Sequence, residues 1–215
     1  MSSTNKKDTI LITGATSGLG MYLSKYFSSK GHPLVITGRN YDVLNELSTN
    51  LSTSVSAIVG DLTKRQSLLE IVDISKRNNV SVLINNAGVV CPGLSIEELK
   101  LNNISEMIEV NLKAPFFLIK LMYENLTDII NINSIVGREP KELRTAYAAS
   151  KWGLRGFSDS LRLESKKNIV DVYPSRIETY PGRKNSMDID FVCSNIYDAY
   201  DVKLNDELIL DGRPK

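Results

Sequence analysis

Short runs of β-branched and aliphatic residues alternate with longer segments in which apolar residues recur every three or four positions. The short runs predict strands, and the longer segments predict amphipathic helices. We expect strands at Thr9–Thr13, Pro33–Thr37, Val55–Gly60, Val80–Ile84, Asp128–Asn133, Ile169–Tyr173 and Glu207–Leu210. We expect helices at Ser17–Ser29, Tyr41–Leu51, Arg65–Asn78, Ile104–Asn125, Ala146–Ser165 and Asp188–Tyr200.

This alternation predicts an α/β fold with a doubly wound, seven-stranded parallel sheet, because a helix after each strand allows every crossover to be right-handed. The 215 residues, 42% of them hydrophobic, are enough for one domain with a substantial core. No repeat, low-complexity tract or long linker divides them. We therefore expect a single domain over residues 1–215.

Two segments are expected to lie outside the packed elements. The N-terminus, about residues 1–8, is polar and is expected to be flexible. The stretch 179–187 is rich in turn-forming residues and follows a predicted strand end, where ligands bind in sheets of this kind. We expect this stretch to be a mobile, shortened substrate loop.

Charge and composition narrow the function classes. The chain has 26 basic and 25 acidic residues and no dense basic block, which argues against nucleic-acid binding and favours a small neutral or anionic metabolite. No segment approaches the roughly 18 uninterrupted apolar residues of a membrane span, and the N-terminus has no apolar targeting core. We expect a soluble, cytoplasmic protein without membrane partners.

Cysteine and histidine are too sparse to build a metal site or a disulfide framework. Cys91 and Cys193 lie far apart without CxxC spacing, which fits a reducing compartment. His32, the only histidine, lies in the turn-like sequence Lys30-Gly31-His32-Pro33, and we expect a surface loop residue. Histidine-based catalytic triads are therefore poor candidates.

A glycine-rich loop follows the first predicted strand and opens the first predicted helix. It reads Thr13-Gly14-Ala15-Thr16-Ser17-Gly18-Leu19-Gly20. Glycines let the backbone approach a pyrophosphate closely, and a helix N-terminus presents free N–H groups and a positive dipole end to it. A tight strand-to-helix turn is the alternative. The expected contacts to a dinucleotide are Gly14, Thr16, Ser17, Gly18, Leu19 and Gly20.

The TGxxxGxG spacing resembles the short-chain dehydrogenase/reductase family of the compact, non-extended type. The resemblance recurs at Asp61-Leu62 and at Asn85-Asn86-Ala87-Gly88, the family's NNAG motif. It implies a Rossmann-type fold, Asp61 beside the adenine and Asn85 beside the adenosine ribose, with Leu62, Ala87 and Gly88 also at the cofactor. The alternatives are a helix-start acid for Asp61 and a simple turn for the NNAG residues.

The end of the second predicted strand bears on the choice of dinucleotide. In sheets of this kind a carboxylate there accepts hydrogen bonds from the ribose hydroxyls of NAD. This chain reads Ile36-Thr37-Gly38-Arg39-Asn40, with no carboxylate and with a guanidinium suited to a 2′-phosphate. We expect NADP(H) to be favoured over NAD(H). Arg39 as a solvated helix-start residue is the alternative.

Tyr147 and Lys151 lie four residues apart, and hence on one face of a predicted helix. A free tyrosine has a pKa of about 10, so proton exchange near neutrality needs a nearby positive charge that favours phenolate. Lys151, helped by an oxidised nicotinamide, supplies that charge. The resemblance implies that Lys151 also hydrogen-bonds the nicotinamide ribose. Taken alone, such a pair would be an ordinary solvated helix face.

Ser134 precedes Tyr147 by 13 positions, and the resemblance implies that its hydroxyl hydrogen-bonds the substrate carbonyl. Asn111 matches a family residue that holds a water in a proton relay ending at the lysine. Pro115 lacks an N–H, so the carbonyl of Asn111 loses its usual helical partner and can bind water. A kink that relieves packing strain is the alternative.

The chain departs from the family pattern after the sixth predicted strand. The family's PGxxxT reads Pro174-Ser175-Arg176-Ile177-Glu178-Thr179 here. Pro174, Ile177 and Thr179 keep their places at the nicotinamide end, but Ser175 replaces a glycine and is strained if positive φ is required.

Only about thirty residues separate this motif from the last predicted strand, so the family's helical lid is short. An open pocket suits a bulky, polar or carrier-linked substrate. Arg176, Arg183 and Lys184 near its mouth are consistent with an anionic substrate or, equally, with a soluble surface.

The predicted helices that carry Asn111 and Tyr147 have apolar positions beyond one face. The resemblance implies a homodimer or homotetramer through them, and ordinary core is the alternative. The positions are Phe116, Leu118, Leu121, Met122, Trp152, Phe157 and Leu161.

These residues together predict an oxidoreductase that transfers a hydride between NADP(H) and a carbonyl or alcohol of a small metabolite, with Tyr147 as general acid/base. The alternative is an NAD(P)-binding regulatory or scaffold protein with little or no turnover, which Ser175 and the short lid make possible. An epimerase or dehydratase acting on a nucleotide sugar would normally need a larger C-terminal domain.

Overall fold

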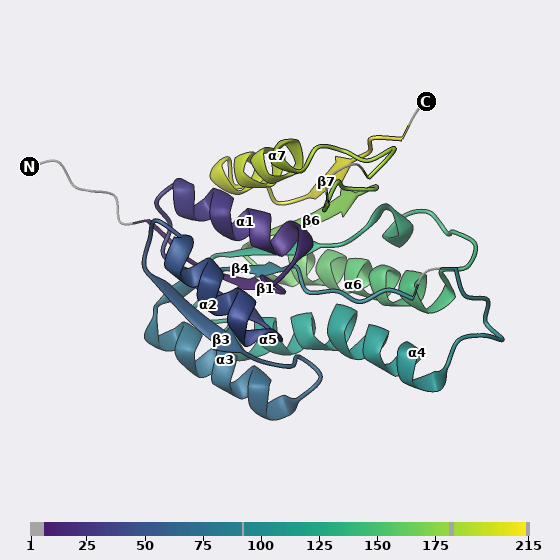
Figure 1. The fold of residues 1–215 in the computed structure, drawn as a ribbon, viewed down its shortest axis with the longest axis horizontal. Helices are drawn as coiled ribbons and strands as arrows, with labels where there is room; N and C mark the ends of the chain where they lie inside the picture. The colour runs from purple at the N-terminus through teal and green to yellow at the C-terminus, as the bar shows by residue number, and fades with distance from the viewer. Residues whose placement is uncertain (1–6, 92, 181–182, 214–215) are drawn as a thin grey trace, which may run out of the picture.

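The computed structural model describes residues 7–91, 93–180 and 183–213 and contains a seven-stranded sheet in the order β3-β2-β1-β4-β5-β6-β7 (Figure 1). Every strand pair is parallel, which confirms the doubly wound α/β fold predicted from the sequence. The strands are β1 (Thr9–Thr13), β2 (Leu34–Gly38), β3 (Val55–Val59), β4 (Val80–Asn85), β5 (Asp128–Ile132), β6 (Asn168–Pro174) and β7 (Glu207–Leu210).

Helices cover both faces of the sheet (Figure 1). One face carries α1 (Gly18–Ser29), α2 (Tyr41–Asn50) and α7 (Ile189–Asp201). The other carries α3 (Arg65–Arg77), α4 (Leu101–Ile108), the π-helical turn η1 (Glu109–Lys113), α5 (Ala114–Met122) and α6 (Thr145–Glu164). A 3₁₀ turn, η2 (Ile135–Gly137), follows β5.

The predicted element bounds agree with the structure to within one residue, with one exception. The helix expected at Ile104–Asn125 begins and ends three residues earlier and consists of α4, η1 and α5. Its π-helical turn lies just before Pro115, which stands in the first turn of α5. A proline has no N–H to continue regular helical hydrogen bonding, so the break next to it has a local cause.

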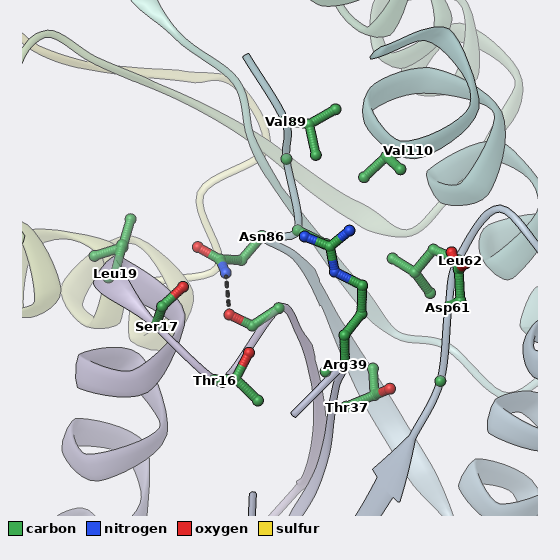
Figure 2. Close-up of a pocket in the computed structure, with 16 residues that line it drawn as sticks. Thr16, Ser17, Leu19, Thr37, Arg39, Asp61, Leu62, Asn86, Val89 and Val110 are labelled. Carbon is green, nitrogen blue, oxygen red and sulfur yellow. Dashed lines mark hydrogen bonds between the residues drawn. The ribbon is translucent and has the colours of Figure 1, made fainter. Parts of the chain in front are cut away.

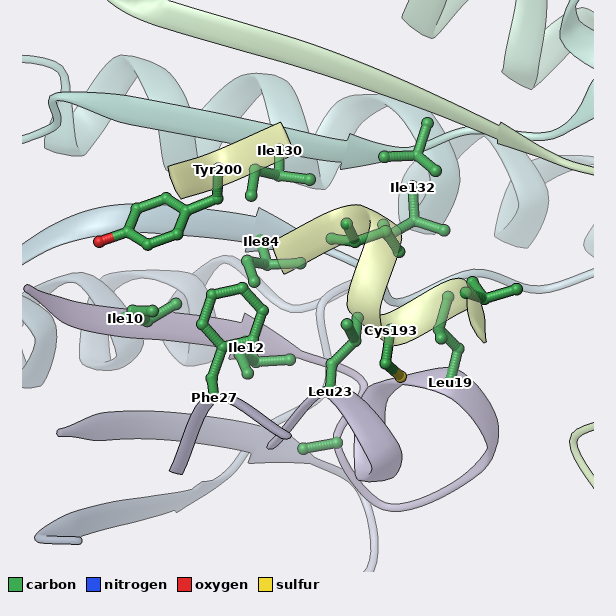
Figure 3. Close-up of a cluster of buried hydrophobic side chains, with 14 of the residues drawn as sticks. Ile10, Ile12, Leu19, Leu23, Phe27, Ile84, Ile130, Ile132, Cys193 and Tyr200 are labelled. Atoms are coloured by element: carbon green, nitrogen blue, oxygen red, sulfur yellow. The ribbon is translucent and has the colours of Figure 1, made fainter. Parts of the chain in front are cut away.

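The core consists of two layers, one on each side of the sheet. Alternate residues of β1 serve different layers: Ile10 and Ile12 pack beneath α1 and α7, and Leu11 packs toward α3 and α5. Figure 3 shows the first layer, where Phe27 of α1 and Tyr200 of α7 meet above the strands. Strands buried on both faces need apolar residues at consecutive positions, which explains the short unbroken runs in the sequence.

His32 is not a surface residue, and that expectation was wrong. It is 1% exposed, and the rings of Phe27, Tyr197 and Tyr200 surround it at centroid distances of 5.4 to 6.0 Å. Its Nδ1 lies 3.0 Å from the carbonyl oxygen of Asp8. Burial lowers the pKa of this imidazole, which stays neutral at physiological pH. The turn after α1 folds beneath α7, and sequence position alone does not reveal that.

The same region holds the start of the described chain. The carboxylate of Asp8 accepts hydrogen bonds from the Tyr200 hydroxyl at 2.6 Å and from the Ser81 hydroxyl at 2.9 Å. Asp8 therefore links β4 and α7 to the beginning of β1. Residues 1–6 of the segment expected to be flexible lie outside the described residues.

The apolar positions on α5 and α6 divide into two groups. Leu118, Met122 and Leu161 belong to the core, as the alternative interpretation predicted. Phe116, Leu121 and Trp152 are exposed, and the partly buried Phe157 contacts the ring of Phe116 at 4.4 Å. Cys91 and Cys193 are free thiols. Within the described ranges, no helix is long and apolar enough to cross a membrane.

Candidate active site

Two adjoining cavities of about 280 and 300 Å³ open where the parallel strands end. The first lies beyond the carboxyl ends of β1, β2 and β3, and the second lies beyond those of β5 and β6. Leu19, Asn86, Gly88 and Val89 line both cavities, so the two form one continuous site. The order of strands reverses at β1 and β4, which is where ligands bind in open α/β sheets.

Close packing of backbone against backbone shapes the first cavity. A Cβ on Gly20 would lie 2.3 Å from the carbonyl oxygen of Gly14, and one on Gly14 would lie 2.8 Å from the Cα of Ala87. Gly14 also has a φ of 70°, which side chains rarely tolerate. Asn86 stabilises this contact, because its Nδ2 donates to the carbonyl oxygen of Thr13 at 2.8 Å. The same Nδ2 also donates to the carbonyl oxygen of Gly14 at 3.2 Å (Figure 2). Gly20 is thus a packing residue, not a cavity-lining one.

The N-terminus of α1 faces the first cavity with its donors available. Ser17 is the N-cap residue, and its side chain makes no capping hydrogen bond to the helix. The first turn contains no acidic residue that would compete for the free N–H groups. Thr16, Ser17, Gly18 and Leu19 all line the cavity. This arrangement of free amides and a hydroxyl suits an anionic group such as a diphosphate.

Arg39 and Asp61 both line the first cavity, and the charge of Arg39 acts on the Asp61 carboxylate. Figure 2 shows Arg39 extending from the end of β2 between Asn86 and Leu62. Its side chain is 71% exposed, and Glu106 is its one ion-pair partner in the described chain, at 3.5 Å. The Asp61 carboxylate accepts hydrogen bonds from the N–H and the hydroxyl of Thr63, which hold the pKa of Asp61 below its usual value. Asp61 therefore both lines the cavity and caps the turn that follows it.

Ser134, Tyr147 and Lys151 line the second cavity together. The Ser134 hydroxyl accepts a hydrogen bond from the N–H of Val136 at 3.3 Å, and it lies near enough to the Tyr147 phenol to lower the pKa of that phenol. Asn133 fixes the turn at Ser134 relative to α6. Its Oδ1 accepts a hydrogen bond from the N–H of Ser134, and its Nδ2 donates to the carbonyl oxygen of Lys151. The end of β5 and the first half of α6 are thereby joined.

Lys151 is 4% exposed, and its Nζ donates to the carbonyl oxygen of Ile132 at 2.8 Å. Burial lowers the pKa of this lysine to about 8, although the charge of Asp171 opposes the change. Burial raises the pKa of Tyr147, while the Ser134 hydrogen bond and the charge of Arg144 act in the other direction. Tyr147 is therefore a neutral phenol at physiological pH, and the Lys151 ammonium lies 5.8 Å from the centre of its ring.

Asn111 and Asn85 lie behind the cavity walls rather than in them. Asn111, on η1, is 1% exposed; its Nδ2 donates to the carbonyl oxygen of Val89 and to the Ser150 hydroxyl, and its Oδ1 accepts from the N–H of Val89. Asn85 ends β4 and donates to Oδ1 of Asn131 inside the sheet at 2.8 Å. Because successive strand residues point to opposite sides, the next residue, Asn86, lines the cavity in its place.

The Ser175 substitution does not strain the backbone. The non-glycine residues with positive φ in the described chain are Asn79, Leu143, Asn185 and Lys203. Ser175 instead accepts a hydrogen bond from the N–H of Gly212 at 3.0 Å, which joins the end of β6 to the segment after β7. Pro174, Ile177 and Thr179 line the second cavity. The mobility expected for 179–187 falls partly on residues 181–182, which lie outside the described residues.

Several residues of the walls were not among the sequence-based candidates. Most of them end a strand or follow one directly, and the reason is that every parallel strand points its carboxyl end at this site. A search of each strand end would have found most of them. The additional lining residues are Thr37, Gly38, Gly60, Asn86, Val89, Val90, Val110, Ile132, Asn133 and Ser175.

Comparison with known proteins finds similar dehydrogenases and reductases. The sequence pattern of a family described as short chain dehydrogenase matches residues 8–188. A 3-oxoacyl-[acyl-carrier-protein] reductase of Rickettsia bellii is 31% identical over 204 residues, 93% of this chain and 77% of its own length. The corresponding reductase of Rickettsia prowazekii is 34% identical over 73% of this chain, which spans 66% of that protein.

Solved structures share the fold over nearly the whole chain. A bulky-bulky ketone specific alcohol dehydrogenase from Comamonas testosteroni has a TM-score of 0.83 at 28% identity and covers 95% of this chain and 86% of its own. An alcohol dehydrogenase from Thermococcus sibiricus, complexed with 5-hydroxy-NADP, has a TM-score of 0.88 at 23% identity, with 97% and 99% covered. The second likeness concerns the fold alone.

Proposed function

Because this chain belongs to the short-chain dehydrogenase family of oxidoreductases, we propose that it transfers a hydride between NADP(H) and the carbonyl or alcohol carbon of a small metabolite. The observation that carries the proposal is the grouping of Ser134, Tyr147 and Lys151 on one wall of a cavity continuous with the glycine loop. The reductase and alcohol dehydrogenase names of the relatives support the same reaction class.

The first cavity fits a dinucleotide. The close approach of the Gly14 and Gly20 backbone leaves the free amides of α1 and the uncommitted Ser17 hydroxyl facing the cavity, where a diphosphate would bind. Arg39, at the end of β2, would hold a 2′-phosphate, and Asp61 with Leu62 would lie beside the adenine. When bound, NADP(H) supplies or accepts the hydride.

Tyr147 is the proposed proton donor in the reducing direction. Burial keeps the Tyr147 phenol protonated, and Ser134 lines the same cavity, so both hydroxyls can hydrogen-bond one substrate oxygen. The proton transfer neutralises the negative charge that develops on this oxygen, and the Ser134 hydroxyl stabilises it. In the oxidising direction Tyr147 accepts the proton instead, which requires positive charge nearby.

Lys151 provides that charge in the proposal. Its Nζ donates to the Ile132 carbonyl oxygen in this structure, and contact with a nicotinamide ribose would orient the cofactor from the same buried position. A Cβ on Gly88 would lie 4.0 Å from Lys151 Nζ and 3.5 Å from Asn111 Oδ1, so these two groups flank one point behind the cavity. We propose that the main-chain carbonyl of Asn111 holds a relay water through which the lysine exchanges protons.

The test is a panel of carbonyls and alcohols followed by NADPH absorbance, with a 3-oxoacyl thioester included because of the reductase relatives. Tyr147→Phe removes only the phenolic oxygen, so NADPH binding should remain while kcat falls by roughly a thousandfold or more. NADPH binding without any Tyr147-dependent turnover would instead favour the regulatory or scaffold alternative.

Self-association is part of the proposal. Phe116, Leu121 and Trp152 are exposed large apolar side chains on α5 and α6, outside the core. Apolar side chains grouped on adjacent helices favour burial against a second copy of the same surface. We propose a homodimer or homotetramer built on this face.

A further inference from the structure

Residues 176–180 and 183–187, the described parts of the segment that replaces a helical lid, lie beside the catalytic cavity. The two ends of this loop are joined because the N–H of Met187 donates to the carbonyl oxygen of Arg176 at 2.8 Å and the N–H of Glu178 donates to that of Met187 at 2.9 Å. Met187 is buried, and a Cβ on Gly212 would lie 2.3 Å from its Cγ. The loop is thus anchored to the segment that follows β7.

The guanidinium of Arg183 hydrogen-bonds two other residues of the same loop. Nη1 of Arg183 donates to the carbonyl oxygen of Ile177 at 3.0 Å and to the Thr179 hydroxyl at 3.2 Å, and the group lies 5.4 Å from the Tyr180 ring centre. These contacts fix Arg183 at the cavity wall while leaving its Nη2 and Nε available as donors.

The charged side chains on the wall of the second cavity are basic. Arg176 and Arg183 line this cavity together with Ser134, and no aspartate or glutamate is among its described lining residues. None of the ion pairs formed within residues 7–91, 93–180 and 183–213 involves either arginine. Arg144 adds a further positive charge that acts on Tyr147.

Nearby carboxylates on other elements have partners of their own. Asp188 caps α7 through the N–H of Phe191, and Asp211 and Glu139 both pair with Arg213. Guanidinium groups bind carboxylates and phosphates through paired, charge-assisted hydrogen bonds. Arg176 and Arg183 form no ion pair within the described residues and line the same cavity as the reacting hydroxyls, which indicates a ligand with its own negative charge.

We propose that the carbonyl substrate carries a carboxylate or phosphate that binds Arg176 and Arg183 while its carbonyl oxygen meets Ser134 and Tyr147. This inference rests on the proposed function and specifies its substrate class. The anionic group takes no part in the chemistry; it positions the carbonyl in a pocket that has little lid to hold it.

The experiment compares charged and uncharged partners with the same reacting carbonyl: acetoacetate with methyl acetoacetate, and dihydroxyacetone phosphate with dihydroxyacetone. Steady-state kinetics are measured for the wild type, Arg176→Gln, Arg183→Gln and the control Lys184→Gln. Lys184 is exposed on the same loop and does not line the cavity, and Lys184→Gln removes one positive charge, as each arginine substitution does.

The wild type should prefer the charged member of at least one pair by about tenfold or more in kcat/KM, because a charge-assisted hydrogen bond contributes this much. Arg176→Gln and Arg183→Gln should each lower that preference about tenfold, mainly through KM. Lys184→Gln should change it less than about twofold. The pair that shows the preference distinguishes carboxylate from phosphate.

An unchanged preference in both arginine variants would overturn the inference. Arg183 could instead hold the cofactor diphosphate, since Thr179 approaches the glycine loop: a Cβ on Gly18 would lie 3.5 Å from its Cγ2. Fluorescence titration of Arg183→Gln with NADPH distinguishes the two roles. If the NADPH Kd rises by the same factor by which the preference for the charged substrate falls, Arg183 binds the cofactor. Arg183→Lys, which keeps the charge, separates charge from loop bracing.

The anion site can be tested even if the proposed function is wrong and the protein shows no turnover. If no compound shows Tyr147-dependent turnover, calorimetry of acetoacetate and of dihydroxyacetone phosphate with the NADPH-loaded protein still measures the anion site. Binding of either anion that Arg176→Gln weakens about tenfold supports the site, and equal binding to both proteins, or none to either, refutes it.

Discussion

One side chain of the site, that of Lys151, opposes the stability of the fold. Lys151 is nearly fully buried, and its ammonium has one main-chain acceptor, the Ile132 carbonyl oxygen. Burial moves its pKa to about 8, so at pH 7 the folded protein carries a charge that would be better solvated in the unfolded chain. A residue that destabilises the fold in this way indicates a functional requirement.

Lys151→Met should therefore stabilise the protein at pH 6.5 while abolishing turnover. The unfolded lysine titrates near its ordinary 10.5 and the folded one near 8, so wild-type stability rises with pH between these values. The advantage of Lys151→Met should shrink by about 2 kcal/mol between pH 7 and pH 9.5. Chemical denaturation at both pH values measures it, and an equal advantage at the two would contradict the role of burial.

Arg39 permits a second prediction about one residue. If its exposed guanidinium binds a 2′-phosphate, Arg39→Asp should lower the ratio of kcat/KM for NADPH to that for NADH by roughly a hundredfold, because an attraction becomes a repulsion. Glu106→Gln is the matched control, since it removes the acid that forms an ion pair with Arg39 and should leave or raise the ratio. A wild type with no NADPH advantage would refute the assignment.

At the scale of elements, the site depends on how closely two loops approach. The glycine loop after β1 and the Asn86-Ala87 segment after β4 touch through their backbones, and Asn86 hydrogen-bonds across the contact. The motif spacing in the sequence predicted both loops but not their contact. Similarly, Pro115 indicated a kink in a helix. The structure shows a π-helical turn just before this proline, and Asn111 in that turn hydrogen-bonds the carbonyl oxygen of Val89.

Gly20→Ala tests the loop contact. Helix propensity alone favours alanine in α1 by about 1 kcal/mol. Its Cβ would, however, lie 2.3 Å from the Gly14 carbonyl oxygen, where backbone must move. We expect a loss of about 1–3 kcal/mol in stability and at least a tenfold rise in the NADPH Kd. Lys25→Ala, at an exposed position of the same helix, should change neither, and a stabilised Gly20→Ala would contradict the packing argument.

At the scale of the whole molecule, the sheet brings together residues from distant parts of the chain. β1 contributes the glycine loop, β5 the Ser134 corner, and β6 the Pro174-to-Thr179 segment, and all point the same way because the strands are parallel. The exposed apolar face of α5 and α6 lies outside this arrangement and is the surface we propose for self-association.

Light scattering checks that surface. The wild type should have at least twice the mass of a 23.9 kDa chain, and Trp152→Glu should shift it toward the monomer, since a charge cannot be buried in an apolar interface without a partner. Leu163→Glu is a suitable control because Leu163 is 92% exposed at the far end of α6. A monomeric wild type would exclude the proposed oligomer.

The sequence by itself determined the element order, the bounds to within a residue for most elements, and the glycine loop, because hydrophobic period and turn residues act locally. Tertiary structure decided what depends on packing between distant segments. It buried His32 beneath α7 and made Asn86 rather than Asn85 a cavity residue. It also hydrogen-bonded Ser175 to Gly212 and placed Arg176 and Arg183 on the cavity that Tyr147 lines. Burial, charge pairing and cavity walls are properties of neighbours in space, and sequence spacing does not specify them.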